Sequence, residues 1–277
     1  MAARSYLYVP GDRPDRLAKA AERAGDAIIA DLEDAVAPRS KDLALREVLA
    51  WLTDGAPATR QVWVRVNAGP AGLEEIAALR DCPALHGIVL PKAELAGAVA
   101  ATTSLGTDRP VAALVETARG LLEAPSLAAV PGISHLGIGE ADLSAELSLT
   151  PSADQRELLP LRLQLVVASA AAALPPPTGP ASLEVRDLTG LRASTLALRA
   201  AGFGSRSAVH PDQVPVIEEV FTPTAEELAA AREVVAAYDT ALAEGTGVLV
   251  DARGRMVDEA VVRTARRTAE LGDRLTR

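Results

Sequence analysis

Short runs of mostly apolar residues recur along the chain, and longer stretches with a helical pattern separate them. Near-continuous apolar runs are typical of strands that are buried on both faces of a sheet. Eight runs precede residue 222, at 5–10, 27–33, 61–67, 87–92, 111–117, 134–142, 182–185 and 206–211. The seventh is short and follows the proline-rich stretch PPPTGP.

The stretches between these runs are amphipathic or alanine-rich, for example residues 14–25, 40–52 and 156–174. Strands that alternate with helices indicate a parallel α/β fold. Eight strand–helix units within about 220 residues fit a closed barrel better than an open sheet. We therefore predict an α/β fold, a (β/α)8 TIM barrel.

The barrel is expected to occupy residues 1–221 as the catalytic domain, which leaves residues 222–277 as a C-terminal helical arm. The arm begins with a threonine cap and glutamates in the first turn, which predict a helix. A glycine-flanked, hairpin-like segment (245–258) and a last helix (258–275) follow. Such an arm suits a lid, a packing element, or an element exchanged between subunits that completes a neighbour's site.

Composition narrows the class of protein. Hydrophobic residues make up 49% of the 277 residues and charged residues 23%, which excludes disorder as the main state. No apolar run reaches the roughly 20 residues of a membrane span, and we see no secretion signal. Cys82 is the only cysteine, so a cysteine-rich zinc site is excluded and a reducing cytoplasm is expected. A net charge of −9 argues against a nucleic-acid partner.

Acidic residues gather where the predicted strands end, at the face of a barrel that carries the active site. They are Asp31, Glu33, Asp34, Glu116, Glu140 and Asp142. Crowded carboxylates repel one another unless a cation neutralises them, and oxygen-only ligands favour Mg²⁺ or Mn²⁺ over zinc. Glu116 and Asp142, from adjacent strands, form the best pair of ligands. The alternative is that these acids only form salt bridges with Arg65 or Lys92.

Arg65 stands within the apolar run VWVRVN. Alternation places Arg65 and Trp63 on one face of the strand and Val64 and Val66 on the other. A charged residue in such a strand needs a partner. We favour bidentate capture of a substrate carboxylate, and the alternative is an internal salt bridge to Glu33 or Asp34.

A series of ordered strings spans nearly the whole chain: RSYLYVPGDRPDRLAKA, DLEDAVAP, VRVN, LPKAE, VETARG, GEADL, AVHP and GRMVD. Together they resemble the CitE-like branch of the HpcH/HpaI aldolase and citrate lyase family. The resemblance implies a (β/α)8 barrel that binds Mg²⁺ and cleaves or forms carbon–carbon bonds in acyl-CoA thioesters. It also implies homo-oligomers, either trimers or hexamers, with coenzyme A present as part of the substrate.

The resemblance assigns roles to individual residues. Glu116 and Asp142 match the metal ligands, with Glu116 also facing the substrate. Arg65 matches the arginine that holds the keto-acid carboxylate, and Glu33 and Asp34 match acids that hydrogen-bond metal-bound water.

Two further assignments concern the ends of the chain. Arg13 and Lys19 match positions that contact CoA phosphates, which suits the start of a helix. An ordinary solvated helix start is the alternative. Asp258 matches an aspartate that acts as acid or base in a neighbouring subunit's barrel. The alternative for Asp258 is a simple N-cap of the last helix.

Two departures from the family pattern bear on substrate identity. Ser205-Arg206 stands where the family often has Gly-Lys, and PPPTGPASLEV replaces an aspartate-containing loop before the seventh strand. His210 is expected to anchor a loop rather than act as a base. The predicted function is a Mg²⁺-dependent CoA ester lyase. The alternatives are a CoA-free pyruvate-type class II aldolase, a citrate lyase β subunit acting on an acyl-carrier-protein thioester, and a catalytically silent scaffold.

Overall fold

The computed structural model describes residues 3–251 and 254–275. The chain divides into two compact units, one ending at Glu219 and the other beginning at Val220. The first unit contains a barrel, and the second contains two long helices.

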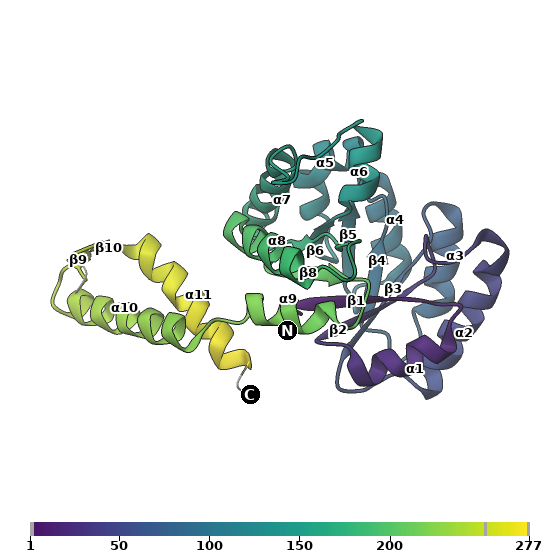
Figure 1. The fold of residues 1–277 in the computed structure, drawn as a ribbon, viewed down its shortest axis with the longest axis horizontal. Helices are drawn as coiled ribbons and strands as arrows, with labels where there is room; N and C mark the ends of the chain where they lie inside the picture. The colour runs from purple at the N-terminus through teal and green to yellow at the C-terminus, as the bar shows by residue number, and fades with distance from the viewer. Residues whose placement is uncertain (1–2, 252–253, 276–277) are drawn as a thin grey trace. The chain divides into compact units, whose positions relative to one another are not determined.

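The first unit is a closed barrel of eight parallel strands in sequential order, each paired with the next and β8 paired with β1 (Figure 1). The strands are β1 (Ser5–Pro10), β2 (Ala27–Asp31), β3 (Gln61–Arg65), β4 (Gly87–Leu90), β5 (Val111–Val115), β6 (Ile133–Ile138), β7 (Thr178–Gly179) and β8 (Ser205–Ala208). The predicted (β/α)8 barrel is therefore confirmed.

Helices follow the strands and lie around the barrel (Figure 1). They are α1 (Pro14–Arg23), η1 (Pro38–Ser40), α2 (Lys41–Asp54), α3 (Pro70–Leu79), α4 (Leu95–Leu105), α5 (Ala118–Ala128), α6 (Glu140–Glu146), α7 (Leu159–Ala171), α8 (Leu188–Ala201) and α9 (Gln213–Phe221). Two helices, α6 and α7, follow β6. The short α6 places two acidic residues, Glu140 and Asp142, in its first turn.

The seventh strand lies earlier than the sequence pattern predicts. Residues 182–185 are outside any strand, and β7 is formed by Thr178 and Gly179 instead. Prolines flank this pair and cannot donate to a ladder, so the sequence of the segment is typical of a loop. The strand forms because Thr178 pairs with Gly137 and Ser205, and the Thr178 and Ser205 hydroxyls lie 2.8 Å apart.

The barrel interior is built by residues spaced two apart along the strands, as alternation requires. Tyr6, Trp63 and His135 pack together near the amino ends of β1, β3 and β6, with ring centroids 5.5–6.2 Å apart. We call these three residues the barrel floor. Two residues further along β1, Tyr8 packs on the same interior cluster. On β3, Arg65 comes two residues after Trp63. The side chains of the barrel interior therefore change from aromatic to charged toward the carboxyl ends of the strands.

The second unit is a helical hairpin with a small sheet. Thr224 caps α10 (Ala225–Ala243) through a complete capping box with Glu227, as the threonine and early glutamates predict. The short strands β9 (Leu249–Val250) and β10 (Met256–Val257) pair antiparallel, which confirms the hairpin-like segment. Helix α11 (Glu259–Leu275) follows, and Val262 packs with Tyr238 and Val257 in the core of this unit.

No helix in the described part of the chain is long and apolar enough to cross a membrane. The cytoplasmic location expected from the single cysteine stays a prediction.

Candidate active site

The carboxyl ends of β2 and β3 bring Asp31 and Arg65 together, because the two residues are register partners. Arg65 donates from Nε and Nη2 to the two Asp31 oxygens at 2.7 and 2.6 Å, and its Cζ lies 5.0 Å from the Tyr8 ring centroid. Asp31 also accepts the backbone N–H groups of Glu33 and Ala35. Burial alone would lower the pKa of Arg65, but its hydrogen bonds to the Asp31 carboxylate outweigh burial, and the pKa is raised. The guanidinium is therefore permanently charged and rigidly held.

Glu33 connects this pair to a second cation. Its Oε1 lies 2.5 Å from Lys92 Nζ, and its Oε2 forms an ion pair with Arg65 Nη1 at 2.8 Å. Burial raises the pKa of Glu33, and the Lys92 hydrogen bond acts against that rise. Asp34 is mostly exposed and lies 3.5 Å from Arg65. The internal salt bridge of Arg65 to Glu33 or Asp34 is therefore present, with Asp31 as the main partner of Arg65.

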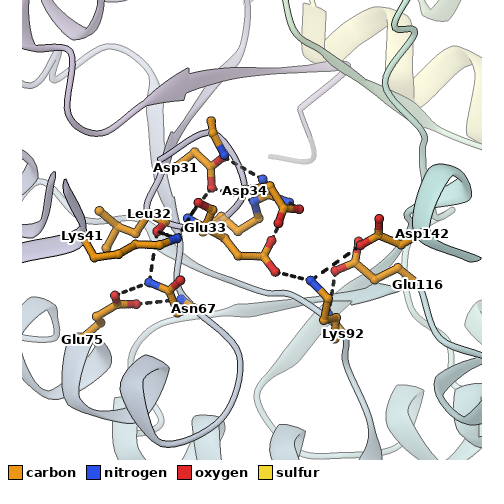
Figure 2. A network of polar contacts seen from close by, with 12 residues as sticks. Asp31, Leu32, Glu33, Asp34, Lys41, Asn67, Glu75, Lys92, Glu116 and Asp142 are labelled. Atoms are coloured by element: carbon orange, nitrogen blue, oxygen red, sulfur yellow. Dashed lines mark hydrogen bonds and ion pairs between the residues drawn. The ribbon is translucent and has the colours of Figure 1, made fainter. Parts of the chain in front are cut away.

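Side chains from neighbouring elements hold the loop after β2 through hydrogen bonds to its backbone (Figure 2). Lys41 Nζ donates to the carbonyls of Leu32 and Glu33 at 2.7 and 2.6 Å. Asn67 donates to the Leu32 carbonyl, and the Glu75 carboxylate accepts both the backbone and side-chain N–H groups of Asn67. These contacts fix the backbone of the acidic loop.

Glu116 lies at the carboxyl end of β5, and only 4% of it is exposed. Its Oε1 accepts the backbone N–H of Lys92 at 2.8 Å. Its Oε2 lies against Gly139, where an added Cβ would come within 2.4 Å of that oxygen. Burial raises the pKa of Glu116 to about 7. A carboxylate in this position needs a neighbouring cation to stay ionised at neutral pH.

We call the open end of the barrel, where the strands have their carboxyl ends, the mouth. Lys92 contacts acids on both sides of the mouth (Figure 2). Its Nζ lies 3.6 Å from Asp142 Oδ2 as well as close to Glu33, while its backbone N–H holds Glu116. The backbone of Lys92 is left-handed, with φ +46°, which is uncommon for a residue with a side chain. Such strain is retained where the surrounding contacts fix it, and it often marks functional sites.

The donor set of the mouth fits a hard divalent cation. Within residues 3–251 and 254–275, no group of three or more His, Cys, Asp or Glu side chains is arranged to enclose a metal. Two carboxylates, Glu116 and Asp142, are what Mg²⁺ commonly uses, since it keeps several waters and takes substrate oxygens. An added cation would favour the ionised form of the buried Glu116, whose pKa is raised.

These groups open into one cavity of about 1160 Å³. Arg65, Glu116, Asp142 and Asp34 line one part of it, and residues from α7, α8 and β8 line another. In that second part, Arg162 donates to both carboxylate oxygens of Glu140, at 2.5 and 2.8 Å. The volume exceeds what a small keto acid fills, and it leaves room for an acyl chain.

The structure places Arg13 at the N-cap of α1, shortly after β1, and Lys19 in the middle of that helix, and both are exposed. Arg13 is paired with Asp15 at 3.0 Å. Neither residue is among the described residues that line the cavity. Their predicted contact with CoA phosphates stays a prediction.

Asp258 belongs to the second unit and immediately precedes α11. Its Oδ1 accepts the backbone N–H groups of Ala260 and Val261 at 3.0 and 3.1 Å. The N-cap role is therefore present, and a catalytic role in a neighbouring subunit stays a prediction. His210 is held by local contacts with Asp212 and Gln213, as expected of a loop anchor.

Sequence reasoning missed part of the mouth. It placed Asp31 among the acids at the strand ends but did not assign it as the main partner of Arg65, which alternation along the strand from Ile29 could have indicated. Tyr8 follows Tyr6 by the same step of two. Lys92 is predicted only as a salt-bridge partner, because nothing in the sequence shows its left-handed backbone.

The barrel and its polar mouth define the class: a TIM-barrel enzyme whose acidic site suits a divalent cation. The family model described as HpcH/HpaI aldolase/citrate lyase matches residues 4–211. The chain belongs to this family, and it is a lyase by that membership.

Two of the curated relatives are named for activity on CoA esters. The chain is 35% identical over 268 residues to a (3S)-malyl-CoA thioesterase of Cereibacter sphaeroides, covering 96% of this chain and 93% of that protein. It is 30% identical over 294 residues to an L-malyl-CoA/β-methylmalyl-CoA lyase of Rhodobacter capsulatus, covering 95% and 92%.

A solved relative has the same fold. CitE of Mycobacterium tuberculosis, in complex with magnesium, acetoacetate and coenzyme A, superposes with a TM-score of 0.81 at 30% identity, covering 98% of each chain. The presence of magnesium and coenzyme A in that structure agrees with the expected cofactors, which are confirmed for the family.

Proposed function

We propose that the protein is a Mg²⁺-dependent CoA ester lyase. It would catalyse reversible Claisen-type cleavage of a β-hydroxyacyl-CoA into an acyl-CoA and a 2-keto acid. The observation that carries this proposal is the joint placement of Arg65, Glu116 and Asp142 on one cavity, with Arg65 fixed by Asp31. The names of the relatives support the CoA ester as the substrate class.

Glu116 and Asp142 would hold the metal, with Mn²⁺ able to replace Mg²⁺. When bound, the ion supplies Lewis-acid polarisation of the substrate's hydroxyl or carbonyl oxygen. Glu33 and Asp34 would orient water at this site. Glu33 is positioned for this role by its contacts to Lys92 and Arg65.

Arg65 would bind the carboxylate of the keto-acid fragment. Asp31 uses the Nε–H and one Nη2–H, while Glu33 and the exposed Asp34 lie beside Nη1. One Nη2–H therefore faces no acid, and a substrate carboxylate would bind it and displace Asp34 from Nη1. A carboxylate bound there in bidentate fashion is oriented for cleavage of the neighbouring carbon–carbon bond. The Asp31 bonds keep the guanidinium from turning during the reaction.

The remaining roles belong to other parts of the chain. Asp258, supplied by a neighbouring subunit of a homo-oligomer, would take the proton from the acyl methyl group in the synthetic direction. Arg13 and Lys19 would bind the phosphates of CoA. Both residues are exposed, and Arg13 stands at the N-cap of α1, where an anionic nucleotide is also favoured by the helix dipole.

A second candidate is hydrolysis of the CoA thioester, favoured by the name of the Cereibacter relative. The same mouth would bind the same ester, and water would attack the thioester carbonyl. A CoA-free aldolase and a subunit acting on a carrier-protein thioester would use the same metal ligands and Arg65. The cavity of about 1160 Å³ favours a thioester over a free keto acid.

Product analysis tests the proposal. The purified full chain is incubated with malyl-CoA, β-methylmalyl-CoA or citryl-CoA, with Mg²⁺ or with EDTA. Release of keto acid and acyl-CoA in equal amounts, only with Mg²⁺, is the expected result. Free CoA without keto acid would instead establish the thioesterase. No turnover of any free CoA ester would contradict both and favour a carrier-protein substrate.

A further inference from the structure

Arg206 on β8 is a buried arginine without an acidic partner. It is 5% exposed, and its side chain contacts only neutral acceptors. Nε donates to the Pro180 carbonyl at 3.0 Å. Nη1 donates to the Leu191 carbonyl, Ser194 Oγ and Thr195 Oγ1 at 3.2, 2.8 and 2.7 Å. Among the described residues, no hydrogen-bond partner faces Nη2.

The acids near Arg206 are already used. Glu140, whose negative charge acts on Arg206, is bound by Arg162 through both carboxylate oxygens. Asp187 caps α8 by accepting the Gly190 N–H. Glu184 lies on the same loop and is exposed, and no ion pair joins it to Arg206 within the described ranges. The wall formed by β8 and α8 therefore carries one uncompensated positive charge.

A buried charge without a counter-charge is costly, so such an arrangement needs a reason. Burial lowers the pKa of Arg206 to about 10, which still leaves it charged at neutral pH. Arg206 lines the same cavity as Arg65, Glu116 and Asp142. A ligand in the cavity would therefore meet two arginines. Acidic side chains balance the charge of Arg65, whereas no acidic side chain balances the charge of Arg206.

We propose that Arg206 binds a second carboxylate of the substrate, so that the protein prefers esters with two acidic groups outside the CoA moiety. This inference rests on the proposed CoA ester lyase function and narrows its substrate class. A planar guanidinium with free Nη2 N–H groups suits a carboxylate, which would complete the hydrogen bonds that the protein leaves open. The carboxylate belongs either to the keto-acid fragment or to the acyl fragment.

A purely structural role is the competing explanation, since Arg206 also ties β8 to α8. The two roles differ in what they predict for ligands. A structural arginine affects every ligand equally through stability. A carboxylate-binding arginine affects only ligands that carry the second acidic group.

Binding measurements without turnover separate these roles. Calorimetry in the presence of Mg²⁺ compares oxaloacetate with 2-oxobutyrate for the keto-acid side, and succinyl-CoA with butyryl-CoA for the acyl side. In one of these pairs, the wild-type protein should bind the ligand with the extra carboxylate about 10- to 100-fold more tightly than the ligand without it. Arg206→Gln should abolish that preference and leave the affinity for the uncharged ligand unchanged. Arg192→Gln, on the same helix α8 as Ser194 but paired with Glu219 at the surface, is the matched control.

If Arg206→Gln does not fold, Arg206→Lys decides, with an expected loss of at least threefold in the preference. Equal wild-type binding within both pairs would overturn the proposal, as would a preference that either variant retains in full. Weaker binding of all ligands together with a lower melting temperature would overturn it in favour of the structural role. A preference that depends on Arg206 in a protein that cleaves no CoA ester would refute the lyase function and leave this subsite standing.

Discussion

The two ends of the barrel interior contrast sharply. At the floor, Tyr6, Trp63 and His135 pack ring against ring, and burial lowers the pKa of His135 to about 4, so the histidine is neutral. At the mouth, at the carboxyl ends of β2, β3, β4 and β5, the pKa values of Glu33, Arg65, Lys92 and Glu116 are raised.

The difference shows how one barrel separates stability from chemistry. The floor buries apolar surface and neutral rings, which favours folding. The mouth confines like charges and a left-handed lysine, arrangements that are costly for folding and useful for binding. A single strand, β3, contributes Trp63 to one and Arg65 to the other.

The largest effect is expected from Glu116→Ala. Loss of one of two predicted metal ligands should lower kcat/KM by about 10²- to 10³-fold, comparable to removing one electrostatic stabiliser of a transition state. The variant should keep the wild-type melting temperature or exceed it, because a buried acid is removed. Steady-state kinetics and thermal melts check this, with the exposed Glu219→Ala as control. Full Mg²⁺-dependent activity in Glu116→Ala would refute its role as a ligand.

Asp31→Asn removes the acid of the Asp31–Arg65 pair at the mouth, and the Asp26–Arg4 pair at the other end of β2 provides the comparison. Removing the carboxylate leaves Arg65 without its bidentate partner, at an expected cost of about 3 kcal/mol in the free energy of unfolding and a marked loss of activity. Asp26→Asn is the matched control, because Asp26 binds Arg4 through two oxygens just before β2, but is less buried.

Urea unfolding and kinetics on both variants give the comparison. Asp26→Asn should lower stability by a smaller amount and leave kcat/KM unchanged. Equal loss of activity in the two variants would show that the mouth pair has no special part in the reaction.

His135 should make the folded state sensitive to acid. Its pKa is about 4 in the folded chain because of burial, below the ordinary value of 6.5. The unfolded chain therefore binds a proton more readily between these values, and stability falls as pH drops from 6.5 toward 4. The contribution reaches about 3 kcal/mol below pH 4.

His135→Phe should flatten this part of the stability–pH curve without changing activity at neutral pH. Chemical unfolding at pH 7.5 and pH 4.5 gives the difference, and Ser134, which also contacts the Val111 carbonyl, keeps a partner in the variant. The same pH dependence in wild type and variant would assign the acid sensitivity to other groups.

Gly139→Ala should have the smallest effect. The new Cβ would lie 2.7 Å from Glu116 Cβ and 2.4 Å from its Oε2, so the carboxylate must move. We expect about a tenfold rise in the Mg²⁺ concentration needed for half-maximal activity and a destabilisation of about 1 kcal/mol. Gly97→Ala on α4, where no atom lies within 4 Å of an added Cβ, is the control. An unchanged Mg²⁺ requirement would mean that the position of Glu116 is not limiting.

The fold could be predicted from sequence because its strands are apolar runs with a clear alternation with helices. The starts of β1, β2, β3, β4 and β5 coincide with the predicted ones. The sequence pattern places β7 four residues too late, because a two-residue strand between prolines carries no periodic signal. Its formation depends on pairing with Gly137 and Ser205, which are distant in sequence.

The composition of the candidate site can be predicted from sequence, but its hydrogen bonds and ion pairs cannot. Residues at strand ends are identifiable because parallel strands bring their carboxyl ends to one face. Which acid binds Arg65 depends on strand register, and Asp31 rather than Glu33 or Asp34 is the register partner. The contacts of Arg206 depend on how α8 packs on β8, and sequence patterns do not show this.

Diffraction from crystals grown with Mn²⁺ tests the central claim most directly, because the anomalous signal locates the metal without reference to activity. The account predicts one strong peak at the mouth, bonded to a carboxylate oxygen of Glu116 and one of Asp142. A peak elsewhere, or a fully loaded site that involves neither residue, would contradict it.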